Sequence, residues 1–139
     1  MRQLFHHIEI ATRGPGLTEL SSQISSWITE QGMTSGLLTV FIKHTSASLL
    51  IQENADPVVQ SDLQNYFDHI APHDPHRYQH GAEGPDDMPA HIRSALTQTS
   101  LSIPLHHGKL CLGTWQGIYL FEHRTKPHLR HIQLHLIGE

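Results

Sequence analysis

The run LRHIQLHLI at 129–137 constrains the fold more than any other stretch, because apolar and polar residues alternate along it one by one. Successive side chains of a β-strand point to opposite faces, so this period of two predicts a strand with one buried face. The inward positions are Ile132, Leu134 and Leu136, and the outward ones are His131, Gln133 and His135. We therefore expect His131 and His135 on a solvated or subunit-facing side of a sheet.

Other apolar runs bounded by turn-forming residues predict further strands. They lie at 3–12, 37–42, 49–52, 101–105, 109–113 and 117–124, with a turn at HHG, 106–108. The C-terminal third of the chain is therefore expected to consist of strands and turns, whereas the first two thirds mix strands with helices.

Two helices are predicted in the first half of the chain. Apolar residues at helical spacing predict one over 18–31, with Thr18 as its cap and Gly32 at its end. Asp56 followed by Pro57 predicts the start of another, because the acid accepts unpaired N–H groups and proline suits the first helical position. The buried face of this second helix is expected to comprise Val59, Leu63, Tyr66 and Phe67.

The composition narrows the class of protein. A length of 139 residues fits one domain spanning 1–139. The formal charge of −4 argues against a nucleic-acid or membrane partner reached by bulk electrostatics, and no apolar run approaches the ~18 residues of a membrane span. The single cysteine, Cys111, excludes an intrachain disulfide and is expected to be a small core residue. We expect a soluble cytoplasmic protein.

A polar segment at 71–88, rich in Pro, His, Asp and Gly, leads into a third helix expected near 88–97. Loops of this length inside a compact domain are usually functional or disordered. Asp87 and His91 are four residues apart, so they share one face if the helix starts near Asp87. His80 lies on a turn-rich stretch that can fold back toward them.

Histidines and acids in this arrangement can bind a divalent metal ion. Imidazole nitrogen is a good ligand for Zn, Fe, Ni or Cu, and a nearby carboxylate commonly orients a ligating histidine. His44, at the end of a buried strand, can join His80 and His91 in a three-histidine site with an open position for water or substrate. The same stretch also fits a polar surface loop in which Asp86 or Asp87 simply caps the helix.

Hydroxyl groups cluster directly after His44, in the stretch HTSAS at 44–48. Thr45, Ser46 and Ser48 can hold a phosphate or orient a ligand at a strand end, where functional loops often emerge. A nucleophilic serine has little support, because no GxSxG elbow surrounds these residues. The alternative interpretation is an ordinary polar strand end.

Two further acids suggest roles near a ligand. Glu53 and Asn54 come just before a predicted helix N-terminus, whose exposed N–H groups favour anions. Glu53 can serve as a ligand, as a base or as a solvated acid. Glu122 lies among apolar strand residues, and a carboxylate there needs a partner such as Arg124 or Arg130.

The stretch LGTWQGIYLFEHR at 112–124 contains an unusual turn, because Asn-Gly or Asp-Gly would be enough for a plain hairpin. Trp115 offers a flat face and Gln116 offers amide donors and acceptors, while Gly113 and Gly117 permit close backbone approach. This combination suits the recognition of a flat heterocycle. A β-bulge with a packing tryptophan explains the same residues without a ligand.

Taken together, HTSASLLIQENADP, YQHGAEGPDDMPAHI and LGTWQGIYLFEHR resemble the signature segments of the YjbQ-type, secondary thiamine-phosphate synthase-like family. The similarity covers nearly the whole chain. It implies an α+β domain with a mainly antiparallel, sandwich- or barrel-like sheet, about three helices and assembly as a homotrimer. It also implies a weak thiamine-phosphate synthase activity, in which a pyrimidine diphosphate and a thiazole phosphate are joined and pyrophosphate is released.

The histidines of the family pattern fall on His44, His80 and His91, beside Glu53 and Asp87. We therefore predict a metal-assisted transferase with a divalent ion of the Zn or Mg class and a small phosphorylated substrate. The assigned residues are His44, His80 and His91 for the metal; Glu53, Asp87 and His44 for catalysis; and Thr45, Ser46, Ser48, Asn54, Trp115, Gln116, Glu122 and Arg130 for substrate binding. A metal-dependent hydrolase and a non-enzymatic binding module are the alternatives.

Overall fold

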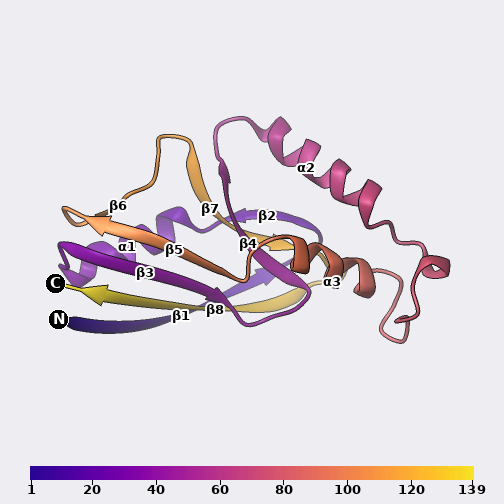
Figure 1. Ribbon diagram of the computed structural model, residues 1–139, viewed down its shortest axis with the longest axis horizontal. Coiled ribbons are helices and arrows are strands. Elements are labelled where there is room, and N and C mark those ends of the chain that lie inside the picture. The colour runs from indigo at the N-terminus through magenta and orange to yellow at the C-terminus, as the bar shows by residue number, and fades with distance from the viewer.

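The computed structural model describes residues 1–139 and contains two antiparallel sheets and three α-helices (Figure 1). The strands are β1 (Arg2–Thr12), β2 (Gly16–Glu19), β3 (Ser35–Ile42), β4 (Ala47–Glu53), β5 (Ser100–His106), β6 (Lys109–Leu110), β7 (Gln116–Glu122) and β8 (His128–Gly138). The helices are α1 (Ser21–Gln31), α2 (Pro57–Ile70), the 3-10 helix η1 (Pro75–Arg77) and α3 (Asp87–Leu96). The predicted α+β class is confirmed.

The larger sheet has the strand order β1-β8-β3-β5-β6, and the smaller one has the order β2-β7-β4. The two terminal strands pair along their whole length, from Arg2 opposite Gly138 to Thr12 opposite His128. In β8 the inward residues Ile132, Leu134 and Leu136 are fully buried, and the histidines between them are half-buried on the outer face. The alternation at 129–137 therefore predicted this strand and its two faces correctly.

One hydrophobic core joins the two sheets and α1. Nineteen buried residues form it, drawn from α1 and the segments that flank it, from the inner face of the larger sheet and from β4 and β7 of the smaller sheet. The other face of β7 is covered as well, since Phe121 packs edge-on against Phe67 of α2 at 5.6 Å. Every residue from Gly117 to Glu122 is consequently buried. In Figure 1, α1 lies behind the left part of the larger sheet, and α2 and α3 lie toward the right.

The first helix begins later than the sequence predicted. Thr18 lies in β2, opposite Leu120 of β7, because this short strand completes the edge of the smaller sheet. The helix then starts at Ser21, with Leu20 as an N-cap that makes no side-chain hydrogen bond. Its end agrees with the prediction, since Gly32 adopts a left-handed φ of 64° that glycine tolerates best.

The second helix starts as predicted. The Asp56 side chain accepts a hydrogen bond from the Val58 N–H at 2.9 Å, and Pro57 occupies the first helical position. Of the predicted apolar face, Phe67 is buried, Val59 and Leu63 are half-buried and Tyr66 is exposed. The prediction for Tyr66 was wrong, because the smaller sheet is narrow and contacts only part of this helix.

The hairpin between β5 and β6 turns at His107 and Gly108, whose φ angles of 50° and 73° are both positive. A two-residue turn of this hand matches the twist of the flanking strands. The chain leaves the sheet just after Leu110, so Cys111 is exposed and not part of the core as predicted.

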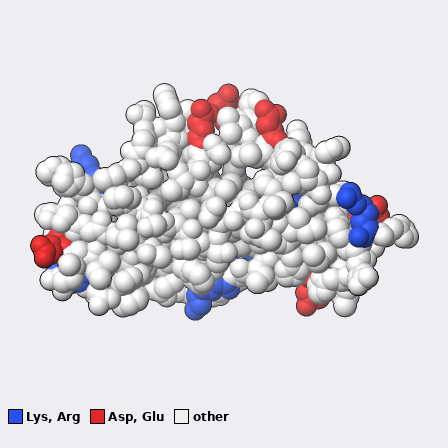
Figure 2. All heavy atoms as spheres, viewed as in Figure 1, with Lys and Arg blue, Asp and Glu red and all other residues white.

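Charged side chains are sparse on the face drawn in Figure 2. Acidic groups gather over the start of α2 at the top of this view, and basic groups stand singly near the edges. No helix of the fold combines the length and the apolar character that crossing a bilayer demands.

Candidate functional site

His80, Asp87 and His91 come together at the N-terminal end of α3. Their ligand atoms all lie within 4.8 Å of one another. The Asp87 Oδ2 atom accepts a hydrogen bond from His80 Nε2 at 2.7 Å, and His91 Nε2 lies 3.2 Å from the same oxygen. The helix begins at Asp87, so the predicted four-residue spacing places Asp87 and His91 on one face. The polar segment before the helix brings His80 back to the same point.

Asp87 is held in place from its other side by Arg124, which follows β7. The Arg124 Nη1 atom donates to Asp87 Oδ1 at 2.8 Å, and its Nε atom donates to Asp86 Oδ2 at 2.9 Å. Burial by itself would raise the pKa of Asp87, but the hydrogen bond from His80 and the charges of His91 and Arg124 hold it below its ordinary value. The cluster therefore contains an ionised, almost fully buried carboxylate beside two half-exposed imidazoles.

Asp86 supports this arrangement and does not cap the helix with its side chain. Its Oδ2 atom accepts hydrogen bonds from the backbone N–H of Thr125, at 2.9 Å, and from the Thr125 hydroxyl, at 3.1 Å. Burial favours the neutral acid, yet these bonds and the Arg124 guanidinium hold the pKa of Asp86 well below its usual range. The two neighbouring acids thus share one arginine.

The ring of His91 is oriented by the chain that follows β3. Its Nδ1 atom lies 3.0 Å from the Thr45 carbonyl oxygen, which can only accept, so Nδ1 carries a proton. Histidines that bind metal commonly donate their second ring nitrogen to a carbonyl in this way, and Nε2 is left for the metal. Here His91 Nε2 points at the shared carboxylate.

Within one chain His44 does not join the other two predicted metal ligands. Its Nε2 atom accepts a hydrogen bond from the backbone N–H of His131 at 2.8 Å, and the two rings stack with centroids 5.7 Å apart. Burial, together with the charges of Arg130 and His131, lowers the pKa of His44. The cluster around Asp87 is therefore two histidines and a carboxylate, because β8 pairs beside β3 and captures the His44 nitrogen.

Glu122 and Arg130 form a buried ion pair, so they are not open to a substrate as predicted. Arg130 donates to both carboxylate oxygens of Glu122, and the Thr12 hydroxyl adds a bond of 2.6 Å. The Arg130 Nη2 atom also donates a hydrogen bond to the Ser46 hydroxyl oxygen at 3.0 Å. Burial alone would raise the pKa of Glu122, but Arg130 and Thr12 hold it below its ordinary value. Of the partners expected for Glu122, Arg130 is the one that forms the ion pair.

Ser48 is also inside the protein. It is fully buried, and its hydroxyl lies 2.8 Å from His123 Nε2 and 2.6 Å from the Thr97 hydroxyl. Burial, helped by the charge of Arg93, lowers the pKa of His123 to about 3. The ring is therefore neutral and hydrogen-bonded to Ser48, and this serine is a structural residue where the sequence suggested a ligand.

The Trp115 turn lies far from the histidines in the same chain. Glu53 pairs with Gln116, and the Asn54 N–H donates to the Trp115 carbonyl, at the end of the β4–β7 ladder opposite Arg124. Glu122 lies six residues after Gln116 along β7, a distance of about 20 Å. Figure 1 shows this turn at the upper left and the loop before α3 at the far right.

The side chains at that distant end are not directed at the histidine cluster. Trp115 is 60 % exposed and does not belong to the hydrophobic core. The Gln116 amide oxygen accepts from the Gly113 N–H at 2.8 Å and so shapes the turn itself. Gly117 lies so close to Glu19 that a Cβ atom would sit 2.8 Å from its carboxylate oxygen, which explains the predicted need for glycine there.

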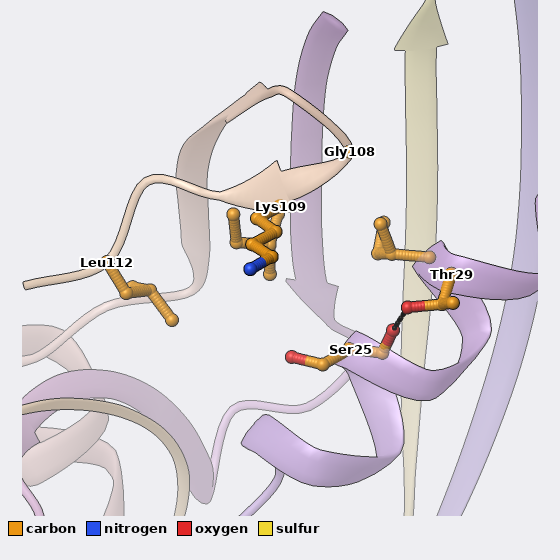
Figure 3. Close-up of a pocket in the computed structure, with 7 residues that line it drawn as sticks. Ser25, Thr29, Gly108, Lys109 and Leu112 are labelled. Carbon is orange, nitrogen blue, oxygen red and sulfur yellow. Dashed lines mark hydrogen bonds between the residues drawn. The ribbon is translucent and has the colours of Figure 1, made fainter. Parts of the chain in front are cut away.

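A hollow of about 540 Å³ lies beside His44. Its lining includes Lys43, His44, Thr45 and Ser46, and the Thr45 carbonyl is the group that holds His91. Another hollow, of about 320 Å³ and shown in Figure 3, lies between α1 and the β6 segment, lined by Ser25, Thr29, Lys109 and Leu112 among others. None of the predicted site residues lines it, so the hollow beside His44 is the better candidate for a ligand.

The sequence did not identify Arg124, Asp86 and Thr125 as supports of the site. Arg124 was considered only as a partner of Glu122, two residues before it. The signal available was the pair of adjacent acids before α3, because two buried carboxylates require a cation. Nothing in the local sequence says which arginine supplies it.

Comparison with known proteins agrees with the resemblance at the level of the family. The model of the UPF0047 protein YjbQ-like family matches residues 6–139. UPF0047 protein sll1880 of Synechocystis is 53 % identical over 138 residues, 99 % of this chain and 94 % of that protein. UPF0047 protein YjbQ of Escherichia coli O157:H7 is 48 % identical over 104 residues, 75 % of each chain.

Solved structures show the same fold. The conserved hypothetical protein TT1486 from Thermus thermophilus superposes with a TM-score of 0.84 at 30 % identity, covering 95 % of this chain and 99 % of that one. A YjbQ/UPF0047 family protein from Clostridium acetobutylicum gives 0.83 at 32 % identity, over 94 % and 99 % of the chains. On its sequence and its fold, this chain belongs to the UPF0047 protein YjbQ-like family.

Proposed function

We propose that this protein is a metal-assisted transferase that acts on a small phosphorylated substrate, with a reaction like that of thiamine-phosphate synthase. The observation that carries the proposal is the convergence of His80, Asp87 and His91 around one point next to a hollow. The thiamine-phosphate chemistry comes from the sequence resemblance. That reaction requires positive charge near a diphosphate, and an ion held by these three side chains would supply it.

The donor set fits a divalent ion of the Zn class better than Mg²⁺. Two imidazole nitrogens and one carboxylate oxygen suit Zn, Fe, Co or Ni, whereas Mg²⁺ prefers oxygen ligands and retains its waters. Such an ion, when bound, would supply the charge that stabilises a departing pyrophosphate. His80, Asp87 and His91 would hold it, and the half-exposed rings leave room for a ligand from solvent.

The chain's own groups preorganise this site. Arg124 fixes the carboxylate of Asp87 from behind, and the Thr45 carbonyl fixes the ring of His91. His44 accepts at Nε2, so its other nitrogen carries the proton and makes the ring a neutral donor at the edge of the hollow. The exposed Thr45 hydroxyl is a second donor for a phosphate oxygen.

We further propose that a neighbouring chain of a homotrimer completes the site with its Trp115 turn. The Trp115 turn and Arg124, which supports the histidine cluster, lie at opposite ends of β7, a strand about 20 Å long, so the two regions can share a substrate only across a subunit boundary. Trp115 would stack on the pyrimidine, and Glu53 and Asn54 beside it would face the same ligand. The polar segment at 71–88 would then lie near that boundary.

The activity is tested with purified protein, Zn²⁺ or Mg²⁺, a hydroxymethylpyrimidine diphosphate and a thiazole phosphate. Formation of thiamine phosphate is expected to depend on the ion and to fall at least about tenfold in His91→Ala, because a metal ligand is lost. His106→Ala is the matched control, since His106 is an exposed histidine on the β5–β6 hairpin. Product formation that is equal in the wild type and in His91→Ala contradicts the proposal.

The shared site is tested by mixing two inactive variants, His91→Ala and Trp115→Ala, after reversible dissociation. If each site uses the histidines of one chain and the tryptophan of the next, random reassembly should restore about a quarter of the wild-type activity. Half of the chains keep His91 and the other half keep Trp115, so about one site in four combines an intact histidine cluster with an intact tryptophan. Absence of any recovery, or a monomer by sedimentation, excludes the shared site but leaves the metal chemistry open.

A metal-dependent hydrolase is the second candidate. The observation in its favour is the donor set itself, since two histidines and a carboxylate with an open position also occur in hydrolytic zinc sites. A screen of phosphoesters and amides, with and without chelator, separates the two. Metal-dependent cleavage of one substrate without a second carbon substrate favours the hydrolase, and tight ion binding without turnover favours a binding module.

A further inference from the structure

A second group of metal-binding side chains lies on the outer face of the larger sheet, away from α3. We propose that His7, Glu9 and His131 bind a divalent transition-metal ion of the Zn, Ni or Cu class. This site shares no residue with the cluster of His80, Asp87 and His91, and it does not depend on the transferase proposal.

Strand register brings the three side chains together. Glu9 of β1 lies directly opposite His131 of β8, and His7 is two residues from Glu9, so all three project from one face. The paired strands are the two ends of the chain, joined by eleven consecutive residue pairs. The positions of these side chains are therefore set by a long and regular ladder.

The distances suit a shared ion. His7 Nε2 and His131 Nδ1 are 3.1 Å apart, and Glu9 Oε1 lies 3.8 Å from the first and 3.7 Å from the second. Ligand atoms around a tetrahedral Zn²⁺ with bonds of 2.0–2.2 Å are about 3.3–3.6 Å apart. Each of the three contacts thus needs to change by only a few tenths of an ångström to admit an ion.

Exposure leaves the site accessible to an ion. The side chains of His7, Glu9 and His131 are 39 %, 53 % and 35 % exposed, so solvent can reach the point between them and supply the remaining ligands. Two imidazoles and one carboxylate select against Mg²⁺ and Ca²⁺, which prefer oxygen. His7 and His131 also stack with ring centroids 5.2 Å apart, which limits the motion needed for binding.

His131 is fixed from behind by His44, whose neighbour Thr45 supports the first cluster. Its backbone N–H donates to His44, and the ring of His44 stacks on its own ring. Thr45, the residue after His44, holds the His91 ring through its carbonyl oxygen. His44 and Thr45, adjacent residues between β3 and β4, therefore orient one histidine ring in each cluster.

The proposal is tested by titrating the full-length protein, in its native assembly, with ZnCl₂ by calorimetry. We expect two ions per chain for the wild type, one for the double variant His7→Asn/His131→Gln, and one for the double variant Asp87→Asn/His91→Asn. The control is His135→Asn, on the same face of β8 four residues from His131, which should leave the count unchanged. A count that His7→Asn/His131→Gln does not alter overturns the proposal.

A second measurement covers the case in which a variant folds poorly. In the Asp87→Asn/His91→Asn background, Cu²⁺ should give an electron paramagnetic resonance spectrum with coupling to two imidazole nitrogens. Zn²⁺ should also raise the melting temperature of that background, because it binds only the folded ladder of β1 and β8. A spectrum without nitrogen coupling overturns the site, as does a melting temperature that Zn²⁺ leaves unchanged.

Discussion

Glu122 and Asp87 are two buried carboxylates paired with arginine, with side chains 1 % and 2 % exposed, and they have opposite surroundings. Both oxygens of Glu122 are bonded by Arg130, Thr12 and backbone N–H groups of the following residues. Asp87 gives one oxygen to Arg124 and turns the other toward two half-exposed histidines. Glu122 therefore stabilises the fold, whereas Asp87 has an oxygen with which it can bind a ligand.

The difference follows from the position of each acid in the fold. Glu122 ends β7, a strand covered on both faces, so every one of its hydrogen bonds must come from protein. Asp87 begins a helix at the surface, where only its rear side is enclosed. Both acids were predicted to lie in one site, because the sequence shows neither the burial of a side chain nor the geometry of its partners.

The largest effect is expected from Glu122→Ala. Removing this acid leaves Arg130 buried without a counter-charge, which should lower the free energy of unfolding by about 3–5 kcal/mol in urea titrations. The matched control is the double variant Glu122→Met/Arg130→Leu, which removes both charges and should recover much of that loss. A single variant as stable as the wild type would mean that the ion pair does not hold the fold.

Asp87→Asn is expected to act on ion binding. The amide is a poorer ligand and no longer neutralises Arg124, so the affinity for Zn²⁺ at this site should fall at least about 10–100-fold by calorimetry. Glu122→Ala protein that remains folded should bind Zn²⁺ as the wild type does. If it binds Zn²⁺ as weakly as Asp87→Asn, the two acids do not have the different roles proposed for them.

Acid titration probes the buried side through His123, next to Glu122. Its pKa is about 3 when folded, against an ordinary value of 6.5, so between these values the unfolded chain binds one more proton. Stability from this residue is complete above about pH 6.5 and falls by about 1.4 kcal/mol per pH unit as the pH drops toward 3. Unfolding curves from pH 7 to 4 measure the slope, and nitrogen chemical shifts should report a neutral His123 ring at pH 5. A charged ring at pH 5 would refute this prediction.

The smallest change in stability is expected for His80→Asn. The ring is 45 % exposed, and partly exposed ion pairs contribute about 0–1 kcal/mol, so the free energy of unfolding should change by less than about 1 kcal/mol. Zn²⁺ affinity should nevertheless drop, since one ligand is gone. A large loss of stability would show that His80 belongs to the structural class of residues, with Glu122.

Several features of the fold were predicted from local sequence. The alternation in β8, the cap at Asp56, the glycine end of α1 and the HHG turn each depend on a few neighbouring residues, and each was found. The start of α1 and the exposure of Cys111 were missed, since they depend on strand pairing and on where the sheet ends. For the candidate site, too, the predictions that depended on neighbouring residues were correct and those that depended on distant ones were not. The spacing of Asp87 and His91 is local, whereas the positions of His44, Glu122 and Trp115 depend on pairing with strands far away in the sequence.

The sequence by itself determined which segments alternate, turn and cap, the small number of available cations, and the adjacency of Asp87 and His91 on one helical turn. These are short-range properties, set by backbone geometry over a few residues. Only the tertiary structure decided that Arg130 closes on Glu122, that Arg124 supports Asp87, and that His131 holds His44. Each of those choices joins residues through sheet register and burial, and a charge buried far from water is stabilised by whichever partner the fold brings within reach.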